Sequence, residues 1–257
     1  MFYAFKITDL FMTLLSVNLN KIALLRNSRG RDFPNVCDFA RKNIDLGVRG
    51  ITVHPRQDER HITNQDAYDL GALCQPLEGI EYNIEGFPSE HFLNMVEEIK
   101  PDQCTLVPDA PGQLTSDHGW DMRTQFDEVD AVCKRLNAMG VRSAIFLDPD
   151  VEQVELAAKS AAQRIELYTE EFASTWNTPQ QEAVLARYAA AAKRAQELGL
   201  GVNAGHDLDS QNLADFLTIS NVLEVSIGHV LTIECIERGM VSVIGDYLDI
   251  CASNPDA

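Results

Sequence analysis

Short runs of apolar residues recur along this chain, and each is followed by a stretch with helical spacing. Runs rich in β-branched residues predict strands, whereas apolar residues three and four positions apart predict amphipathic helices. The predicted strands cover residues 14–20, 50–55, 80–86, 103–109, 142–148, 164–169, 201–206 and 223–229. The helix-like segments cover residues 35–46, 65–75, 89–99, 121–139, 151–161, 180–198, 210–218 and 230–250. This alternation predicts an α/β chain with a parallel sheet, and its number of units favours a single (β/α)8 TIM barrel.

The polar residues near the strand ends are informative because barrels of this kind carry their active sites at the C-terminal face. Every second side chain of a barrel strand points inward, and several of the inward positions are polar. They are Asn18, Asn20, Thr52, His54, Asn83, Glu85, Glu166, Tyr168, Glu224 and Ser226. Barrel interiors are normally filled by Val, Ile and Leu, and a buried polar group without a partner costs about 1–3 kcal/mol. The pattern therefore predicts a polar ligand at the barrel mouth.

The charge distribution narrows the class of ligand. The formal net charge of −18 argues against nucleic acid or an anionic membrane as a partner. No apolar run approaches the roughly 20 residues that span a bilayer. Residues 1–60 hold 10 of the 21 Lys and Arg residues but only 6 of the 39 Asp and Glu residues. This local excess of positive charge favours a small anionic ligand near the N-terminal part of the chain.

Cysteine usage and the start of the pattern set the expected context. The six cysteines stand apart without a C-x-x-C pair, which is typical of neither a disulfide framework nor a structural zinc site. We therefore expect a reducing cytoplasm and no metal site. The barrel pattern begins only at Leu14, so residues 1–12 are predicted to be a dispensable extension and residues 13–257 the catalytic barrel.

Three titratable residues stand where a barrel would expose them to substrate. His54 and His206 close two predicted strands, and neutral imidazole is suited to general acid–base work near neutral pH. Glu85 points inward at the top of the third strand, where burial would raise its pKa. His91 and His118 are assigned to a helix surface and a loop, without a role.

Phosphate is the anion that this pattern favours. Loops after the seventh and eighth barrel strands often hold phosphate at a helix N-terminus, and Gly228 stands at that turn. Arg29, Arg56 and His61 are candidates for a second anion site. The segment 108–121 is rich in Gly, Pro and Asp and is predicted to be a mobile lid.

Several stretches together resemble the pyridoxine 5′-phosphate synthase family. They are VNLNKIALLRNSRG (17–30), GITVHPRQDERHI (50–62), NIEG (83–86), TLVPD with QLTSDHGWD (105–121), ELYTE (166–170), NAGHDL (203–208) and EVSIGH (224–229). The resemblance runs from about residue 13 to the C-terminus. It implies a barrel with extra helices and no cofactor, assembled as a homo-octamer.

The resemblance also implies a reaction and a set of roles. The substrates are 3-amino-2-oxopropyl phosphate and 1-deoxy-D-xylulose 5-phosphate, which condense to pyridoxine 5′-phosphate with release of phosphate and water. His54 and Glu85 become proton acceptors and His206 the proton donor. The aminoketone phosphate would be bound by Asn18, Arg29, Gly228 and His229. The deoxyxylulose phosphate would be bound by Arg56, His61 and Thr115.

Two positions depart from the commoner family pattern. Many members have Asp-His where this chain has Asn20-Lys21, and many have Gly where it has Asp207. We interpret both as marks of a subgroup that keeps the function, with all three residues near the substrate. Lys21 attracts the anionic substrates electrostatically or, in a sharper hypothesis, forms a Schiff base with a ketone.

Two other functions are compatible with the fold. A metal-dependent sugar-phosphate isomerase or epimerase would use Glu166, His206 and Glu224 as ligands. A barrel that binds a phosphorylated metabolite without catalysis would have no need for His54, Glu85 and His206 together.

Overall fold

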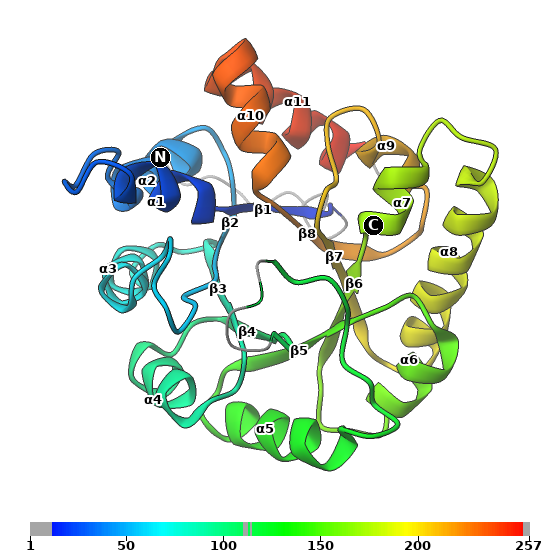
Figure 1. Ribbon diagram of the computed structural model, residues 1–257. Helices are drawn as coiled ribbons and strands as arrows, with labels where there is room; N and C mark the ends of the chain where they lie inside the picture. Colours follow the sequence, from blue (N-terminus) through cyan, green and yellow to red (C-terminus); the bar gives the residue numbers. More distant parts are fainter. Residues whose placement is uncertain (1–11, 110–112, 114, 254–257) are drawn as a thin grey trace.

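Eight parallel strands pair in sequence order and close into a barrel, with β1 hydrogen-bonded to both β2 and β8. This computed structural model describes residues 12–109, 113 and 115–253. The strands are β1 (Leu14–Asn18), β2 (Gly50–Val53), β3 (Glu81–Gly86), β4 (Gln103–Leu106), β5 (Arg142–Leu147), β6 (Arg164–Tyr168), β7 (Gly201–Gly205) and β8 (Val222–Ile227). Figure 1 looks along the barrel and shows the helices as a ring around the strands. The predicted (β/α)8 barrel is confirmed.

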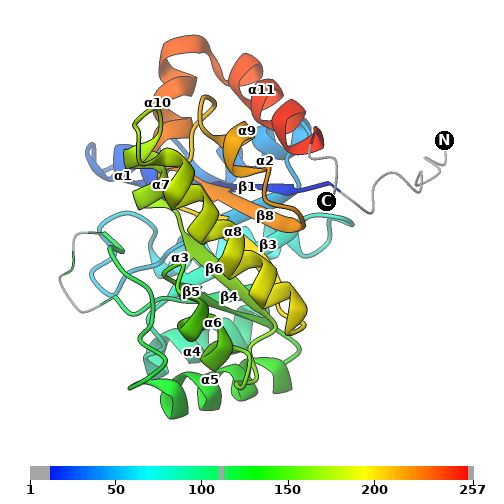
Figure 2. The same cartoon turned by 90° about the vertical axis from the view of Figure 1, so that its right-hand side faces the viewer.

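The helices follow the strands in alternation, with additional ones inserted. They are α1 (Asn20–Asn27), α2 (Val36–Asp45), α3 (Asn64–Cys74), α4 (Glu90–Ile99), α5 (Phe126–Ala138), α6 (Val151–Ala157), α7 (Glu170–Thr175), α8 (Gln181–Glu197), α9 (Leu213–Phe216), α10 (His229–Arg238) and α11 (Met240–Ala252). The side view in Figure 2 places α1, α7 and α10 toward the same end of the barrel. These helices directly follow β1, β6 and β8, so this end carries the C-terminal ends of the strands.

The apolar core lies between the barrel and its helices. Alternate strand residues such as Ile51, Val53, Ile84 and Leu147 point outward and are fully buried beneath the helices. Many inward positions of the strands are polar and buried, and among them Thr52, Asn83, Glu166 and Glu224 were predicted. The structure adds Ser16, Gln103, Thr105 and Asn203, whereas β5 turns the apolar Ala144 and Phe146 inward. The interior of the barrel is therefore a hydrogen-bonded polar layer.

Local capping fixes the helices that border the mouth. Thr63 and Asp66 form a capping box at the start of α3, because each side chain accepts the other's backbone N–H. Asp66 also forms an ion pair with Arg26 of α1. This pair ties α1 to α3 and so sets the geometry of the loops after β1 and β2.

Several predicted boundaries are wrong. The first strand ends at Asn18, and Asn20 begins α1, so Asn18 and Asn20 do not share one strand face. The segment 121–139 becomes helical only at Phe126, and 151–161 ends its helix at Ala157. The segment 230–250 is two helices that meet at Gly239, whose φ of 90° ends α10.

Two further expectations concern the N-terminal extension and the cysteines. The predicted extension 1–12 lies outside the described residues except for Met12. All six cysteines are described, and all are free. In the part of the chain that the structure describes, no helix has both the length and the apolar character needed to cross a membrane.

Candidate active site

A cavity of about 580 Å³ opens at the C-terminal ends of the strands. Apart from Arg29, every site residue predicted from the sequence lines it. These residues are Asn18, Asn20, Lys21, His54, Arg56, His61, Glu85, Thr115, His206, Asp207, Gly228 and His229. Arg29 lies in the turn after α1, is exposed, and is not among the lining residues. The cavity also takes in Leu24, Arg60, Val107, Ser116, Phe146, Glu166 and Ser226.

His54 follows β2 directly and is buried with 5% of its surface exposed. Asn20 fixes this point of the chain, because its side-chain oxygen accepts the His54 backbone N–H at 2.9 Å. The imidazole lies between two carboxylates, with Nδ1 at 3.9 Å from Glu85 and Nε2 at 3.8 Å from Asp109. Burial, and then the positive charge of Arg56, hold the pKa of His54 well below its usual value. His54 is therefore neutral at pH 7 and free to accept a proton.

Glu85 and Glu166 point into the cavity from β3 and β6. Asn18 and Ser226 each approach the Glu85 carboxylate at 3.4 Å. Burial, followed by the negative charges of Glu224 and Asp109, raises the pKa of Glu85 to about 8. Burial and the Glu85 charge likewise raise the pKa of Glu166. Both carboxyl groups therefore hold protons far more readily than exposed glutamates.

A glycine makes room for Glu166. A Cβ on Gly205 would lie 2.5 Å from the Glu166 carboxylate oxygen, which is closer than real Cβ atoms approach. The absence of a side chain at the end of β7 is thus a requirement for the position of Glu166.

His206 stands at the end of β7 in a strained turn. Its φ is 89° and that of Asp207 is 58°, both in the left-handed region. Asp207 contacts Nδ1 of His206 at 2.7 Å, and Thr115 contacts Nε2 at 3.2 Å. The hydrogen bond to His206 lowers the pKa of Asp207. Asp207 therefore adopts a backbone conformation that suits Gly and also orients the histidine.

The positive residues form one rim of the cavity. Arg56 and Arg60 both donate to the backbone carbonyl of Gln113, at 3.3 and 3.0 Å. Burial, and then Arg56 and Lys21, lower the pKa of His61 to about 4. Its Nδ1 accepts the Ile62 N–H at 2.9 Å. A neutral His61 thus has Nε2–H available as a donor, whereas the arginines supply the positive charge.

A second edge of the cavity is the N-terminus of α10, which follows β8 and so lies on the other side of β1 from the arginine rim after β2. Gly228 is its N-cap and makes no side-chain cap, so backbone N–H groups of the first turn face the cavity. A Cβ on Gly228 would lie 2.9 Å from the Asn18 Cβ. Only glycine lets β1 and this helix terminus approach so closely, which is the geometry expected of a phosphate site.

Two described residues of the predicted lid segment 108–121, Thr115 and Ser116, line the cavity. The described residues of this segment also include Gln113, and residues 110–112 and 114 lie outside the described part. Ser116 donates a hydrogen bond to Asp109 at 2.9 Å. The mobility of this segment stays a prediction.

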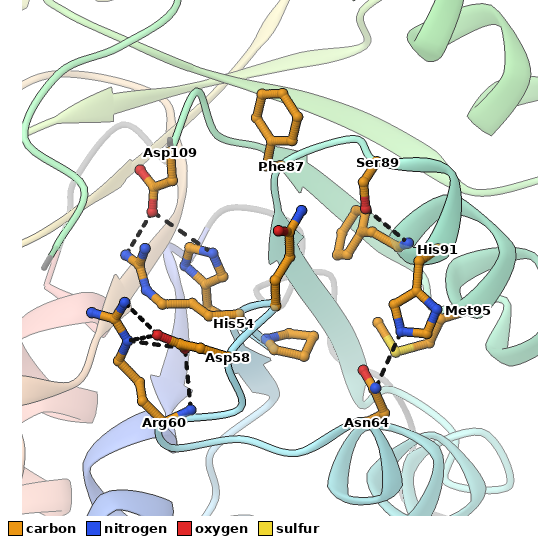
Figure 3. Close-up of a pocket in the computed structure, with 13 residues that line it drawn as sticks. His54, Asp58, Arg60, Asn64, Phe87, Ser89, His91, Met95 and Asp109 are labelled. Carbon is orange, nitrogen blue, oxygen red and sulfur yellow. Dashed lines mark hydrogen bonds and ion pairs between the residues drawn. The ribbon is translucent and has the colours of Figure 1, made fainter. Parts of the chain in front are cut away.

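Asp109 is the residue near the site whose role the sequence did not suggest. It lies after β4 and is 5% exposed. Figure 3 shows its carboxylate joined by dashed lines to the His54 ring and to an arginine, which is Arg56 at 2.6 Å. Its position at a predicted strand end was the available signal, but nothing in the sequence indicated which side chains it would meet.

The model of one protein family, described as "Pyridoxal phosphate biosynthesis protein PdxJ", matches residues 15–253. The chain belongs to this family. It is therefore an enzyme of pyridoxal phosphate biosynthesis, that is, of vitamin B6 biosynthesis.

Relatives from several bacteria agree with the assignment. A protein of Bacteroides fragilis named pyridoxine 5′-phosphate synthase is 48% identical over 237 residues, 92% of this chain and 98% of that one. A protein of the same name from Christiangramia forsetii is 48% identical over 93% of this chain and 99% of its own length. One from Porphyromonas gingivalis is 46% identical, with 93% and 98% covered.

Solved structures confirm the fold class alone. Phosphoribosyl anthranilate isomerase from Thermus thermophilus matches with a TM-score of 0.56 and 13% identity, over 94% of this chain and 99% of that chain. A structure described as native KDPGal matches with a TM-score of 0.62 and 10% identity, over 92% and 93%.

The family assignment decides between the functions that the sequence left open. The isomerase hypothesis required Glu166, His206 and Glu224 around one metal. Glu224 instead pairs with Arg164 and Gln103, on the side of the barrel where β4 and β6 begin. Among the described residues, no group of three or more His, Cys, Asp or Glu side chains is arranged to hold a metal ion. A non-catalytic barrel does not fit a family of biosynthetic enzymes.

Proposed function

We propose that this chain is a pyridoxine 5′-phosphate synthase that condenses 3-amino-2-oxopropyl phosphate with 1-deoxy-D-xylulose 5-phosphate. The products are pyridoxine 5′-phosphate, phosphate and water. The observation that carries the proposal is that His54, Glu85 and His206 line one cavity together. The family resemblance gives these three residues the proton-transfer roles, and the most similar relatives bear the name of this activity.

The chemistry requires protons to move in both directions at neutral pH. Imine formation, enolisation, elimination and ring closure each take a proton from one atom and return one to another. A buried His54 with a lowered pKa is neutral, so that one ring nitrogen carries a lone pair that can take a proton. A Glu85 with a pKa of about 8 exchanges protons near neutrality, and it accepts one whenever it is ionised. His206, oriented by Asp207, is the proton donor.

The two phosphates are assigned to two separate edges of the cavity. The aminoketone phosphate binds at the α10 N-terminus, with Asn18, Gly228 and His229 around it. The deoxyxylulose phosphate binds at the arginine rim, with Arg56 and His61. Thr115 contacts the same substrate, and Asn20, Lys21 and Asp207 also line the cavity. The role of Arg29 remains a prediction from the resemblance, since its side chain lies outside this cavity.

The test is direct. The purified protein is incubated with both substrates, and pyridoxine 5′-phosphate is sought by mass spectrometry, with each substrate alone as the control. We expect the product only in the complete mixture, and no metal or organic cofactor should be needed. No product over a range of pH and protein concentration would contradict the proposal.

Assembly and context complete the proposal. We expect a homo-octamer, which light scattering would detect, working in the cytoplasm. A chain that starts at Met12 should keep its melting temperature and its turnover, because the family match begins only at residue 15.

A further inference from the structure

Asp109 connects three parts of the mouth that lie apart in the sequence. Its Oδ2 forms an ion pair with Arg56 at 2.6 Å and accepts the Ser116 hydroxyl at 2.9 Å. The same oxygen lies 3.8 Å from Nε2 of His54. One carboxylate oxygen therefore contacts Arg56 and Ser116 and lies near His54.

The other carboxylate oxygen has no partner among the described residues. Oδ1 of Asp109 is buried, and no described group donates a hydrogen bond to it. A buried, unsatisfied polar atom costs about 1–3 kcal/mol, and such atoms concentrate at functional sites. With Oδ1 unpaired, the negative charge of Asp109 depends largely on Arg56.

Arg56 also lines the substrate cavity. A phosphate dianion is a stronger partner for a guanidinium than one carboxylate, so substrate and Asp109 compete for the same side chain. When the phosphate binds, Asp109 loses its main positive partner while it stays buried. His54 can then offer it a proton-bearing nitrogen, because Nε2 lies 3.8 Å from Oδ2, a contact that Figure 3 marks with a dashed line.

We propose that Asp109 is a positioning residue that changes its hydrogen-bonding partner. Arg56 holds its carboxylate in the empty enzyme, and the carboxylate accepts a hydrogen bond from Nε2–H of His54 when substrate phosphate engages Arg56. This inference rests on the proposed function. This change of partner fixes the His54 tautomer with its proton on Nε2, so that Nδ1, which faces Glu85, becomes the accepting atom. A proton taken from substrate goes to Nδ1, Asp109 stays ionised, and the imidazolium is stabilised by the carboxylate until the proton is returned.

The surroundings of His54 explain why such a device is useful. Arg56, Arg60 and His61 on its own loop, together with burial, lower the pKa of His54 in the empty site. Glu85 on β3 and Asp109 after β4 are the acids that face its two nitrogens. Once phosphate occupies Arg56, the freed carboxylate opposes the positive charges of Arg56 and Arg60. His54 thus becomes a stronger base only when substrate is present.

The test compares Asp109→Asn and Asp109→Glu with wild type in turnover and in the pH profile of kcat. We expect Asp109→Asn to lower kcat by about 10–100-fold and to shift the acidic limb of the profile to lower pH by about one unit. The KM for the deoxyxylulose phosphate should stay equal or fall, because Arg56 loses a competitor. Asp109→Glu, which keeps the charge, should restore most of kcat and the position of the limb.

A matched control is Asp130→Asn on α5. Asp130 pairs with Lys134 at 2.7 Å and accepts the Ala161 N–H at 2.9 Å, away from the cavity. This variant should leave kcat and the pH profile unchanged. Parallel losses of stability and activity in Asp109→Asn, with an unmoved acidic limb, would show a structural role only and overturn the proposal.

Wild-type protein supplies a second reading that needs no variant. Imidazole ¹⁵N NMR, with inorganic phosphate as the probe, reports the tautomer of His54. We expect phosphate to shift His54 toward protonated Nε2 and unprotonated Nδ1, and an unchanged tautomer at saturating phosphate would refute the change of partner. This titration does not depend on turnover, so failure of the proposed function and failure of this inference are distinguishable.

Discussion

The two ends of the barrel interior use the same residue types in opposite ways. Toward the start of the strands, Arg164 pairs with Glu224 at 3.4 Å and donates to Asn203 at 3.0 Å, and Asn203 donates to Glu224 at 2.9 Å. At the mouth, Glu166 and His54 are buried and Glu85 is partly buried. Their polar neighbours include neutral groups and other acids.

This difference teaches how one barrel separates stability from reactivity. Near the start of the strands, Arg164 and Glu224 have an opposite charge or an amide in contact, and these contacts compensate for the hydration that the buried charges lose. Burial raises the pKa of Glu224 as well, but the positive charge of Arg164 opposes that shift. At the mouth, Glu85 has no cation in contact, and burial together with neighbouring acids raises its pKa to about 8. Substitutions at the two ends should therefore have different kinds of effect.

The largest expected effect concerns turnover at the mouth. His54→Ala, Glu85→Gln and His206→Ala should each lower kcat by about 10²–10⁴-fold, the range for loss of a positioned acid or base. Binding of a phosphate analogue should survive, because the phosphate rims are untouched. Steady-state kinetics and calorimetry check this, and a variant with normal kcat would be removed from the mechanism.

Substitutions near the start of the strands should lower the stability of the protein instead. Arg164→Met leaves Glu224 buried without its cation, so the free energy of unfolding should fall by about 3–5 kcal/mol. The folded fraction should keep its kcat. Denaturant unfolding measures this, with Arg187→Met as the control. That variant breaks an exposed pair with Glu171 and should change stability by about 0–1 kcal/mol. Equal effects from both variants would remove the distinction between the two ends.

Asp207 sharpens the comparison, because it brings a paired charge into the mouth. Asp207→Gly relieves the left-handed backbone, but it removes the partner of His206 Nδ1. We expect kcat to fall about tenfold while the melting temperature stays equal or rises. Asp207→Asn keeps a hydrogen-bond acceptor, so its kcat should lie between those of wild type and Asp207→Gly. Unchanged kcat in both variants would limit Asp207 to a backbone role.

The smallest effect is expected at Lys21. Lys21→Met should raise KM about fivefold, equivalent to roughly 1 kcal/mol, with kcat nearly unchanged, as expected for lost uniform binding. The defect should shrink as salt rises, because screening weakens the attraction to anionic substrates. A substrate adduct trapped on Lys21 by borohydride, seen in the peptide mass, would support the Schiff-base hypothesis instead.

Much of the fold was predictable because period and register leave strong traces in sequence. Strand residues such as Ile51 and Val53 alternate with Thr52, and this alternation revealed both the strand and the polar interior. The boundaries were harder. Helix α1 escaped prediction because Asn20 continues the polar alternation of Asn18, and α7 because six residues are too few for a helical period.

The candidate site was predictable where residues stand at strand ends. His54, Glu85 and His206 converge because parallel strands end at one face of the barrel. The other features of the site could not be predicted, because they depend on packing between segments that are distant in the sequence. Examples are the ion pair of Asp109 with Arg56 and the space that Gly205 leaves for Glu166. The exposed position of Arg29 could not be foreseen for the same reason, since the family motif gives its identity and not its direction.

The protonation of Glu85 tests the central claim most directly. ¹³C NMR of labelled glutamate carboxyl groups, with Glu85→Gln to assign the signal, gives its titration in the folded protein. The account predicts a pKa of about 8. Because the folded pKa lies above the unfolded value, wild type should also lose stability relative to Glu85→Gln as pH rises toward 8. A Glu85 carboxyl that titrates near the ordinary value of 4.5 would contradict the view that the mouth keeps its acids unpaired for proton transfer.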